Sequence, residues 1–419
     1  MVIKVRDIQL AKQGKRVVDW AERHMPVLMT IRREMRKKKP LKGLRVGMTL
    51  HIEAKTAALV RTLVAGGAEV AISGCNPLST KDDVVAALLK EGIDVYAWRG
   101  QSERDYYASI NRVIDHRPDI MIDDGADLIS MVHAKRPEKI RKIIGACEET
   151  TTGVNRMRAM AEDGALKFPV IAVNDTNAKR LFDNRFGTAE STLQGIMTAT
   201  NTLIAGKEIV VVGYGFVGRG IASRAKGMGA IVTIIETDPI RALEAAMDGF
   251  RVTRMSEVAH VGDIFITTTG SIHVVRKEHM ARMKDGAILS NAGHFNVEIN
   301  IKDLSKLSLA RRKIKEDVEE FKIKVGRRLY LLAEGRLVNL AGERSLGHPM
   351  EIMDMSFALQ VLSTTYLAEH GRQLPPKVFD VPAEIDRKVA RLKLSSLGIK
   401  LEKRTNEQIR YGKSWLIGT

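Results

Sequence analysis

The feature of this sequence that most constrains its fold is a glycine-rich turn between an apolar segment and a helix-forming one. Residues 208–212, EIVVV, lead into Gly213, Gly215 and Gly218. In a strand–turn–helix unit the first glycine permits a tight turn, the second lets the backbone approach a pyrophosphate, and the third allows close helix–strand packing. This spacing predicts a dinucleotide-binding α/β domain.

An acidic residue strengthens this interpretation. The next expected strand, 231–236, ends in Glu236. A carboxylate at that place accepts hydrogen bonds from ribose hydroxyls and repels a 2′-phosphate, so the pattern favours NAD over NADP. A purely structural glycine turn is the alternative, but strand, turn, helix and acid together favour the cofactor.

Short apolar segments alternate with helix-forming segments in two successive blocks. Such alternation is typical of parallel sheets covered by helices on both faces. We therefore predict an α/β fold with two doubly wound parallel-sheet domains, a substrate domain and a Rossmann NAD domain, plus a short helical C-terminal tail. The expected strands are 44–52, 69–73, 94–98, 119–122 and 169–173 in the first block, and 208–212, 231–236, 264–268 and 287–290 in the second.

A chain of 419 residues is long enough for two or three separate cores. We expect residues 1–184 to form the first segment of the substrate-binding domain, which opens with a helix over 1–39 interrupted at Pro26. Residues 185–346 would form the NAD-binding domain, residues 347–380 would return to the first domain, and residues 381–419 would form the tail.

Composition narrows the class of protein. The sequence has no apolar run long enough to span a bilayer and no secretory signal, so a cytoplasmic protein is expected. Two cysteines, Cys75 and Cys147, without paired Cys/His spacing predict neither a disulfide framework nor a metal site. The net charge of +17 would attract polyanions, but the basic runs 32–39 and 311–315 lack interleaved aromatics, which favours solvated helix faces over nucleic-acid binding.

Polar side chains follow several expected strands of the first block. His51 follows the first strand, Asp124 the fourth and Lys179 the fifth, and Glu149 lies in a loop between the last two. Each has an ordinary alternative, as a core histidine, a helix cap or a capped turn. Because ligands of open α/β sheets bind at the carboxyl ends of the strands, and buried charges without a ligand are costly, the pattern predicts a substrate site there.

With these motifs the chain resembles the S-adenosylhomocysteine hydrolase family over nearly its whole length. It lacks the extended tail with a lysine and a tyrosine through which animal-type members reach a neighbour's NAD, and so resembles the short-tailed prokaryotic type. The blocks that carry the resemblance are HIEAKTA (51–57), DDGADL (123–128), EETTTG (148–153), NDTNAK (174–179), GYGFVGRG (213–220), NAGHFNVEI (291–299) and GHP (347–349).

The resemblance implies reversible hydrolysis of S-adenosyl-L-homocysteine to adenosine and L-homocysteine. In that family a bound NAD oxidises the 3′-hydroxyl, homocysteine is eliminated from C5′, water adds, and the ketone is reduced back. Lys179 and Asp183 would handle the hydroxyl proton, the lysine with a pKa that falls if it is desolvated. His51, Asp124 and His294 would surround C4′ and C5′.

The same resemblance implies the binding residues, a homotetramer and a place in the methyl cycle of one-carbon metabolism. Substrate contacts would come from Glu53, Lys55, Glu149, Thr150, Lys179, Asp183 and His348. Cofactor contacts would come from Thr150, Thr151, Thr152, Asn184, Gly213, Gly215, Phe216, Val217, Gly218, Glu236, Thr268, Asn291 and Asn339.

Three alternative functions stay open at this point. Lys55 stands where animal-type members have a glutamate facing the purine, and a lysine can only donate, which suits the 6-oxo base of S-inosyl-L-homocysteine. A mutual pair of Lys55 with Glu53 accounts for the change equally well. More remote are an ordinary NAD-dependent dehydrogenase with net NADH production and a non-catalytic nucleotide-binding regulatory protein, although the joint presence of the catalytic residues speaks against a decayed site.

Overall fold

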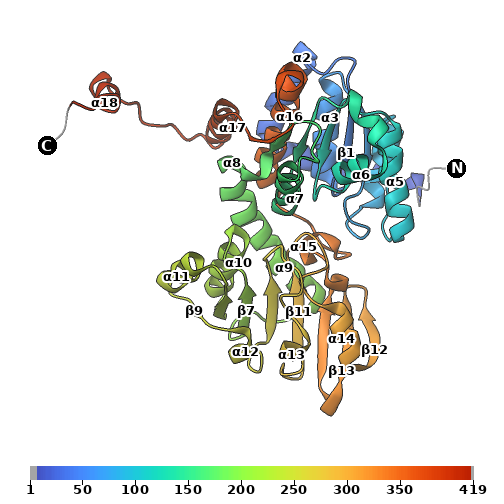
Figure 1. The fold of residues 1–419 in the computed structure, drawn as a ribbon, viewed down its shortest axis with the longest axis vertical. Helices are drawn as coiled ribbons and strands as arrows, with labels where there is room; N and C mark the ends of the chain where they lie inside the picture. The colour runs from blue at the N-terminus through green and yellow to red at the C-terminus, as the bar shows by residue number, and fades with distance from the viewer. Residues whose placement is uncertain (1–6, 417–419) are drawn as a thin grey trace.

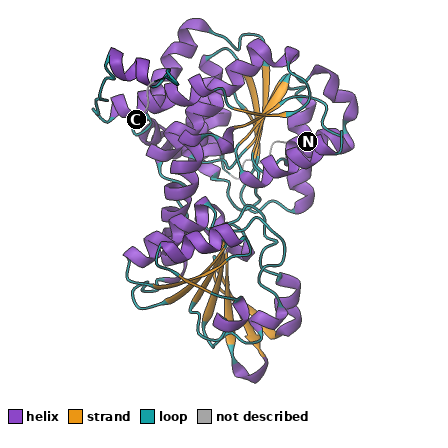
Figure 2. Cartoon of the chain, turned by 60° about the vertical axis from the view of Figure 1, so that its left-hand side comes forward, coloured by secondary structure: helices purple, strands orange, loops and turns teal. Residues whose placement is uncertain are grey.

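The computed structural model describes residues 7–416, so the ends of the expected N-terminal helix and of the tail, 1–6 and 417–419, lie outside it. The chain forms two α/β bodies, each with a sheet between helices (Figures 1 and 2). The predicted α/β class with two doubly wound domains is confirmed. Among the described residues, no helix is long and apolar enough to cross a membrane.

The first sheet is parallel throughout, in the order β15-β6-β5-β4-β1-β2-β3. Its strands are nearly all apolar because helices cover both faces. The predictions missed β5, whose short GACE segment carries no apolar run. The bounds are β1 Arg45–Thr49, β2 Glu69–Ser73, β3 Asp94–Tyr96, β4 Ile120–Asp123, β5 Gly145–Glu148, β6 Val170–Ala172 and β15 Val378–Asp380.

The helices around this sheet come from both ends of the chain. The expected N-terminal helix forms α1 and α2, separated before Pro26 because proline suits the first turn of a helix. The bounds are α1 Ala11–Arg23, α2 Pro26–Lys38, α3 Ala54–Ala65, α4 Asp82–Lys90, α5 Glu103–Asp115, α6 Asp127–Lys135, α7 Thr151–Glu162, α16 Met350–His370 and α17 Ala383–Ser396.

The second sheet has the order β12-β13-β14-β11-β10-β7-β8-β9. Its central strands are parallel, but β12 and β13 run antiparallel at one edge, so this sheet is mixed. The bounds are β7 Glu208–Val212, β8 Ile231–Ile235, β9 Arg251–Val252, β10 Ile264–Thr267, β11 Ala287–Asn291, β12 Ser308–Lys315, β13 Val318–Ile323 and β14 Arg328–Leu332, with α10 Phe216–Gly227, α11 Pro239–Met247, α12 Met255–Val258, α13 Lys277–Met280 and α14 Ile301–Leu307.

The expectation of a helix face at 311–315 was wrong, because this basic run lies on the edge strand β12. There Arg311 pairs with Glu319, and Arg312 pairs with Glu320, both on the neighbouring strand β13. Charged residues on an edge strand discourage pairing with other chains. The basic run at 32–39, by contrast, largely lies on helix α2, which ends at Lys38.

Two connections join the bodies. The outgoing one is α8 (Asn177–Lys179), a π-helical segment (Arg180–Gly187) and α9 (Thr188–Thr200). Thus the helix expected at 189–205 ends at Thr200, where Asn201 takes a left-handed conformation. The returning connection is α15 (Val338–Ala341), which leads into α16. The tail continues through α17 to α18 (Asn406–Tyr411), which stands away from both bodies (Figure 1).

A buried aspartate ties the returning segment to the N-terminal helices. Asp354 on α16 is fully buried and accepts hydrogen bonds from the backbone N–H groups of Val27 and Leu28 in the first turn of α2. Lys393 of α17 donates to the same carboxylate at 3.1 Å. The Asp354 carboxylate therefore caps one helix and pairs with another.

We expect Asp354→Ala to lower the free energy of unfolding by about 3 kcal/mol, because it leaves a partly buried ammonium and two helix-terminal N–H groups without their acceptor. Denaturant unfolding measures this change. Glu369→Ala, at an exposed site on the same helix, is the control and should cost less than about 0.5 kcal/mol. Equal losses in the two variants would contradict this role of Asp354.

Candidate functional site

A cavity of about 480 Å³ lies between the two sheets, at the carboxyl ends of strands from both. The first sheet contributes residues that follow β1, β4 and β5, and the second contributes residues that follow β7, β8, β10 and β11. Most residues expected at the site line it: His51, Glu53, Asp124, Glu149, Thr150, Thr151, Thr152, Lys179, Asp183, Asn184, Gly213, Gly215, Phe216, Val217, Glu236, Thr268, His294 and His348.

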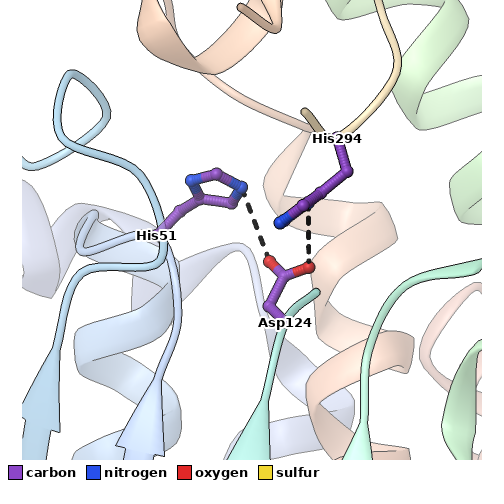
Figure 3. Close-up of side chains that lie close together, drawn as sticks. All are labelled: His51, Asp124 and His294. Carbon is purple, nitrogen blue, oxygen red and sulfur yellow. Dashed lines mark ion pairs between the residues drawn. The ribbon is translucent and has the colours of Figure 1, made fainter. Parts of the chain in front are cut away.

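Within this cavity two histidines face one aspartate (Figure 3). The Asp124 carboxylate lies 3.5 Å from Nε2 of His51 and 3.5 Å from Nδ1 of His294. Burial lowers the pKa of His51 to about 4, so its imidazole is neutral at pH 7, and its other nitrogen lies 2.6 Å from the Ser79 hydroxyl. A neutral imidazole beside a carboxylate can accept and return a proton.

The donor atoms of His51, Asp124 and His294 lie within 4.8 Å of one another, which is compatible with a metal ion. Cysteine and histidine spacing could not indicate this arrangement, because the three residues are far apart in the chain and come together only when the cavity forms.

A second charged cluster surrounds Lys179. The Lys179 ammonium donates to Asn184 at 2.7 Å and lies 3.5 Å from Asp183 and 3.7 Å from Glu149. The expectation that desolvation lowers the pKa of Lys179 was wrong. Burial does push in that direction, but the neighbouring carboxylates, Asp183 foremost, outweigh it and raise the pKa.

The two carboxylates of this cluster, Glu149 and Asp183, differ in the direction in which their pKa is shifted. Burial raises the pKa of Glu149 to about 7. The pKa of Asp183 is also pushed up by burial, but Lys179 and His348 lower it below its usual range. At neutral pH the cluster therefore holds a protonated lysine, an ionised aspartate and a glutamate that can take up or release a proton.

Helix α16 supplies partners that the sequence analysis missed. Ser356 donates to Asp183 at 2.8 Å, and Gln360 donates to Glu149 at 2.5 Å. His348, just before the helix, lies 2.6 Å from the Asp183 carboxylate. Ser356 and Gln360 lie about one turn apart on α16 and are fully buried. The same helix also buries Asp354, Ser363 and Thr364, so no sequence signal singled out these two residues.

The glycine-rich turn also lines this cavity. Gly213 has a φ of +101°, which favours glycine, and a Cβ at Gly218 would lie 2.0 Å from the Gly213 carbonyl oxygen. A Cβ at Gly215 would meet only Arg241, at 3.9 Å, so the backbone there borders open space. These residues fit a dinucleotide, whose pyrophosphate would lie against the bare backbone at the start of α10.

The Glu236 carboxylate stands beside this turn and accepts from the N–H of Tyr214 at 2.7 Å. Burial favours its neutral form, but hydrogen bonds from the N–H groups of Asp238 and Tyr214 prevail and lower its pKa. It is thus ionised and available to ribose hydroxyls. Arg241, Thr269 and Ser271, which the predictions did not include, also line the cavity.

Four expected residues are not among those that line the cavity: Lys55, Gly218, Asn291 and Asn339. The Lys55 ammonium lies 2.8 Å from the Glu53 carboxylate and donates to the carbonyl of Leu346 at 2.7 Å. Asn291 donates to the carbonyls of Gly293, Phe295 and Gly335, and so fixes the segment that carries His294. Asn339 donates to Ser191.

The fold and the cavity define an NAD-binding α/β enzyme with acid–base groups from two domains around one cleft. Models of two families match the chain, "S-adenosyl-L-homocysteine hydrolase" over residues 2–140 and "S-adenosyl-L-homocysteine hydrolase, NAD binding domain" over residues 184–345. The chain belongs to the S-adenosyl-L-homocysteine hydrolase family, and NAD is its cofactor.

Relatives with two different names match with similar identity. The chain is 57% identical to the S-inosyl-L-homocysteine hydrolase of Methanopyrus kandleri, with 99% of this chain and 98% of the relative covered. It is 56% identical to the adenosylhomocysteinase of Sulfurisphaera tokodaii, with 100% of both covered. It is 58% identical to the adenosylhomocysteinase of Pyrococcus abyssi, with 99% and 98% covered.

Proposed function

We propose that this enzyme catalyses the reversible hydrolysis of S-adenosyl-L-homocysteine to adenosine and L-homocysteine. One observation carries the proposal. The Lys179 cluster, the His51–Asp124–His294 group and the glycine-rich turn all line the same cavity. NAD, when bound, would take a hydride from C3′ of the nucleoside and return it at the end of the cycle.

The chain's own residues supply the proton transfers. The Lys179 ammonium, kept charged by Asp183, would hold the 3′-oxygen as negative charge develops there, and Glu149, with a pKa of about 7, would accept the hydroxyl proton. His51, which is neutral at pH 7, would take the C4′ proton once the neighbouring ketone has made it acidic. That proton would pass from His51 through Asp124 and His294 to the leaving sulfur, and the same groups would then accept a proton from the incoming water.

Each cofactor residue is assigned to the part of NAD that it would contact. Gly213, Gly215, Phe216 and Val217 would hold the pyrophosphate, Glu236 the adenosine ribose, and residues 150–152, Asn184 and Thr268 the nicotinamide end. Asn291 and Asn339 would act from behind the cavity by fixing the segments that border it. The alternative of a non-catalytic regulatory protein has no observation in its favour.

The choice of purine base depends on Glu53 and Lys55. Glu53 lines the cavity and can accept from a 6-amino group, whereas Lys55 lies behind it with its ammonium bound to Glu53 and Leu346. A Cβ on Gly347 would lie 2.4 Å from the Glu53 carboxylate, so the loop that carries His348 packs against this residue. These contacts favour the adenosyl substrate over the inosyl one.

We expect kcat/KM for S-adenosyl-L-homocysteine to exceed that for S-inosyl-L-homocysteine by about tenfold, equivalent to ~1.4 kcal/mol. Release of free thiol from each substrate, with NAD present and net NADH followed in parallel, measures this ratio. Glu53→Gln should bring this ratio closer to one, because an amide can also donate a hydrogen bond to a 6-oxo group. A preference for the inosyl compound would reverse the assignment of the base, and thiol release from neither substrate would refute the hydrolase.

Cytoplasmic location, a role in the methyl cycle and a homotetramer complete the proposal. Self-association is supported by the tail, where Trp415 and Leu416 are 90% and 75% exposed in the single chain. We also propose that the functional units are 1–184 with 347–380 for substrate, 185–346 for NAD and 381–419 for assembly. Light scattering of the purified protein tests the tetramer.

A further inference from the structure

An arginine outside the catalytic groups holds the turn that carries Asp124. Arg156, on α7, donates to the carbonyl of Gly125 and to the carboxylate of Asp127 at 2.7 Å. Its second terminal nitrogen donates to the Ser130 hydroxyl at 3.0 Å. One guanidinium therefore binds the Asp124–Gly125 turn and the first turn of α6 together.

The same turn is held from the other side by a buried carboxylate. Glu148, at the end of β5, accepts from the N–H groups of Gly125 at 2.8 Å and Thr150 at 3.0 Å. Both backbone polar groups of Gly125 thus have partners from the β5–α7 region, so the direction of the preceding Asp124 side chain is fixed relative to that region.

Arg156 also reaches across the cleft to the other sheet. Its guanidinium lies over the ring of Phe295, 5.7 Å from the centroid, and Phe295 follows His294 in the segment after β11. The rings of His294 and Phe295 pack edge to face at 4.7 Å. A cation over an aromatic face is attracted by the ring quadrupole.

The two segments that Arg156 touches meet directly at the catalytic group. A Cβ added to Gly125, whose φ is +98°, would lie 2.2 Å from Nε2 of His294. His294 in turn faces Asp124 at 3.5 Å. The approach of the two domains at this point therefore needs a bare glycine backbone on one side and an oriented histidine on the other.

The geometry points to Arg156 as a positioning residue for the reaction, which holds the Asp124–Gly125 turn against the His294–Phe295 segment while the cleft is closed. This inference rests on the proposed function. In that reaction a ketone is formed early and reduced again only at the last step, so an opening of the cleft in between releases the ketone and leaves the cofactor reduced.

The test measures this loss of the intermediate. Wild-type and Arg156→Gln enzymes, each loaded with NAD, are given excess S-adenosyl-L-homocysteine, and bound reduced cofactor is measured by its absorbance after equal numbers of turnovers. We expect the reduced fraction to rise about fivefold in Arg156→Gln, the order of effect of a partly exposed cation–aromatic contact. Arg156→Lys keeps the cation, so its reduced fraction should stay close to that of the wild type.

Two further variants separate positioning from a general structural role. Arg136→Gln is the control, because Arg136 has three polar partners within one domain, Asn111, Asp115 and Glu138, and lies away from the cleft. Phe295→Leu should also raise the reduced fraction, and the double variant should show less than the sum of the two effects, since both substitutions remove the shared contact between Arg156 and Phe295. If Arg156→Gln does not fold, Phe295→Leu alone carries the test.

A reduced fraction in Arg156→Gln no higher than in Arg136→Gln would overturn the inference, as would additive effects in the double variant. These outcomes leave the hydrolase itself intact, because the wild type still releases thiol. A wild type that releases no thiol from either nucleoside substrate would instead overturn the proposed function, and this inference with it.

Discussion

Lys179→Met should lower kcat for thiol release by about a thousandfold, the largest effect expected of a single substitution here. Methionine matches the length of lysine but has no donor for the developing charge on the 3′-oxygen. The loss arises at the first step, because the raised pKa of Lys179 keeps it an ammonium between Asp183 and Glu149. The variant should therefore form reduced cofactor about a thousandfold more slowly when mixed with adenosine.

Rapid-mixing absorbance of the reduced cofactor measures that first step separately from thiol release. Because removal of one partner from a buried charge cluster also destabilises the fold, the thermal midpoint of the variant must be recorded beside its activity. Lys388→Met is the matched control, since Lys388 pairs with Glu34 at 2.7 Å away from the cavity. Normal reduction of the cofactor in Lys179→Met would contradict the role given to this lysine.

Asp124→Asn should lower kcat for thiol release by about a hundredfold or more, yet leave the first oxidation largely intact. Asparagine keeps the shape of the side chain but removes the negative charge that faces His51 and His294. Elimination at C5′ would then lack its proton relay, while the Lys179 cluster, which we propose acts at C3′, is unchanged. We expect reduced cofactor to accumulate with little thiol.

The same rapid-mixing assay, run beside a thiol assay, measures both steps for Asp124→Asn. Asp115→Asn, at an exposed ion pair with Arg136, is the control and should change neither step. An equal fall in oxidation and in thiol release would show that Asp124 does not separate the two half-reactions, and would favour a single acid–base centre in place of two.

The sequence was most informative where chemistry imposes local geometry. The turn at Gly213 to Gly218 was predicted because the positive φ at Gly213 and the close contact at Gly218 favour glycine, and Glu236 because it ends the expected next strand. The parallel strands were predicted because burial on both faces makes them apolar. The charged clusters followed from the ends of those strands, since parallel strands bring their carboxyl ends to one edge.

What the sequence could not supply depends on contacts between distant segments. The raised pKa of Lys179 reflects two carboxylates whose distances from the ammonium are set only by the fold. The sequence alone could not decide whether Lys55 faces the purine or pairs with Glu53, because this depends on the distance between the two side chains. Ser356 and Gln360 act from a helix that returns to the first domain near the end of the chain. The edge strand β12 was mistaken for a helix face because a charged run carries no clear periodicity.

The central claim is that hydrolysis proceeds through a ketone that makes the C4′ proton exchangeable. The most direct test is to incubate the NAD-loaded enzyme with adenosine in deuterium oxide and to measure deuterium at C4′ by NMR. The account predicts deuterium at C4′ of the recovered adenosine. Exchange should be slower in Asp124→Asn, because the Asp124 charge favours proton uptake by His51. Thiol release from S-adenosyl-L-homocysteine by an enzyme that leaves C4′ fully protiated would contradict it.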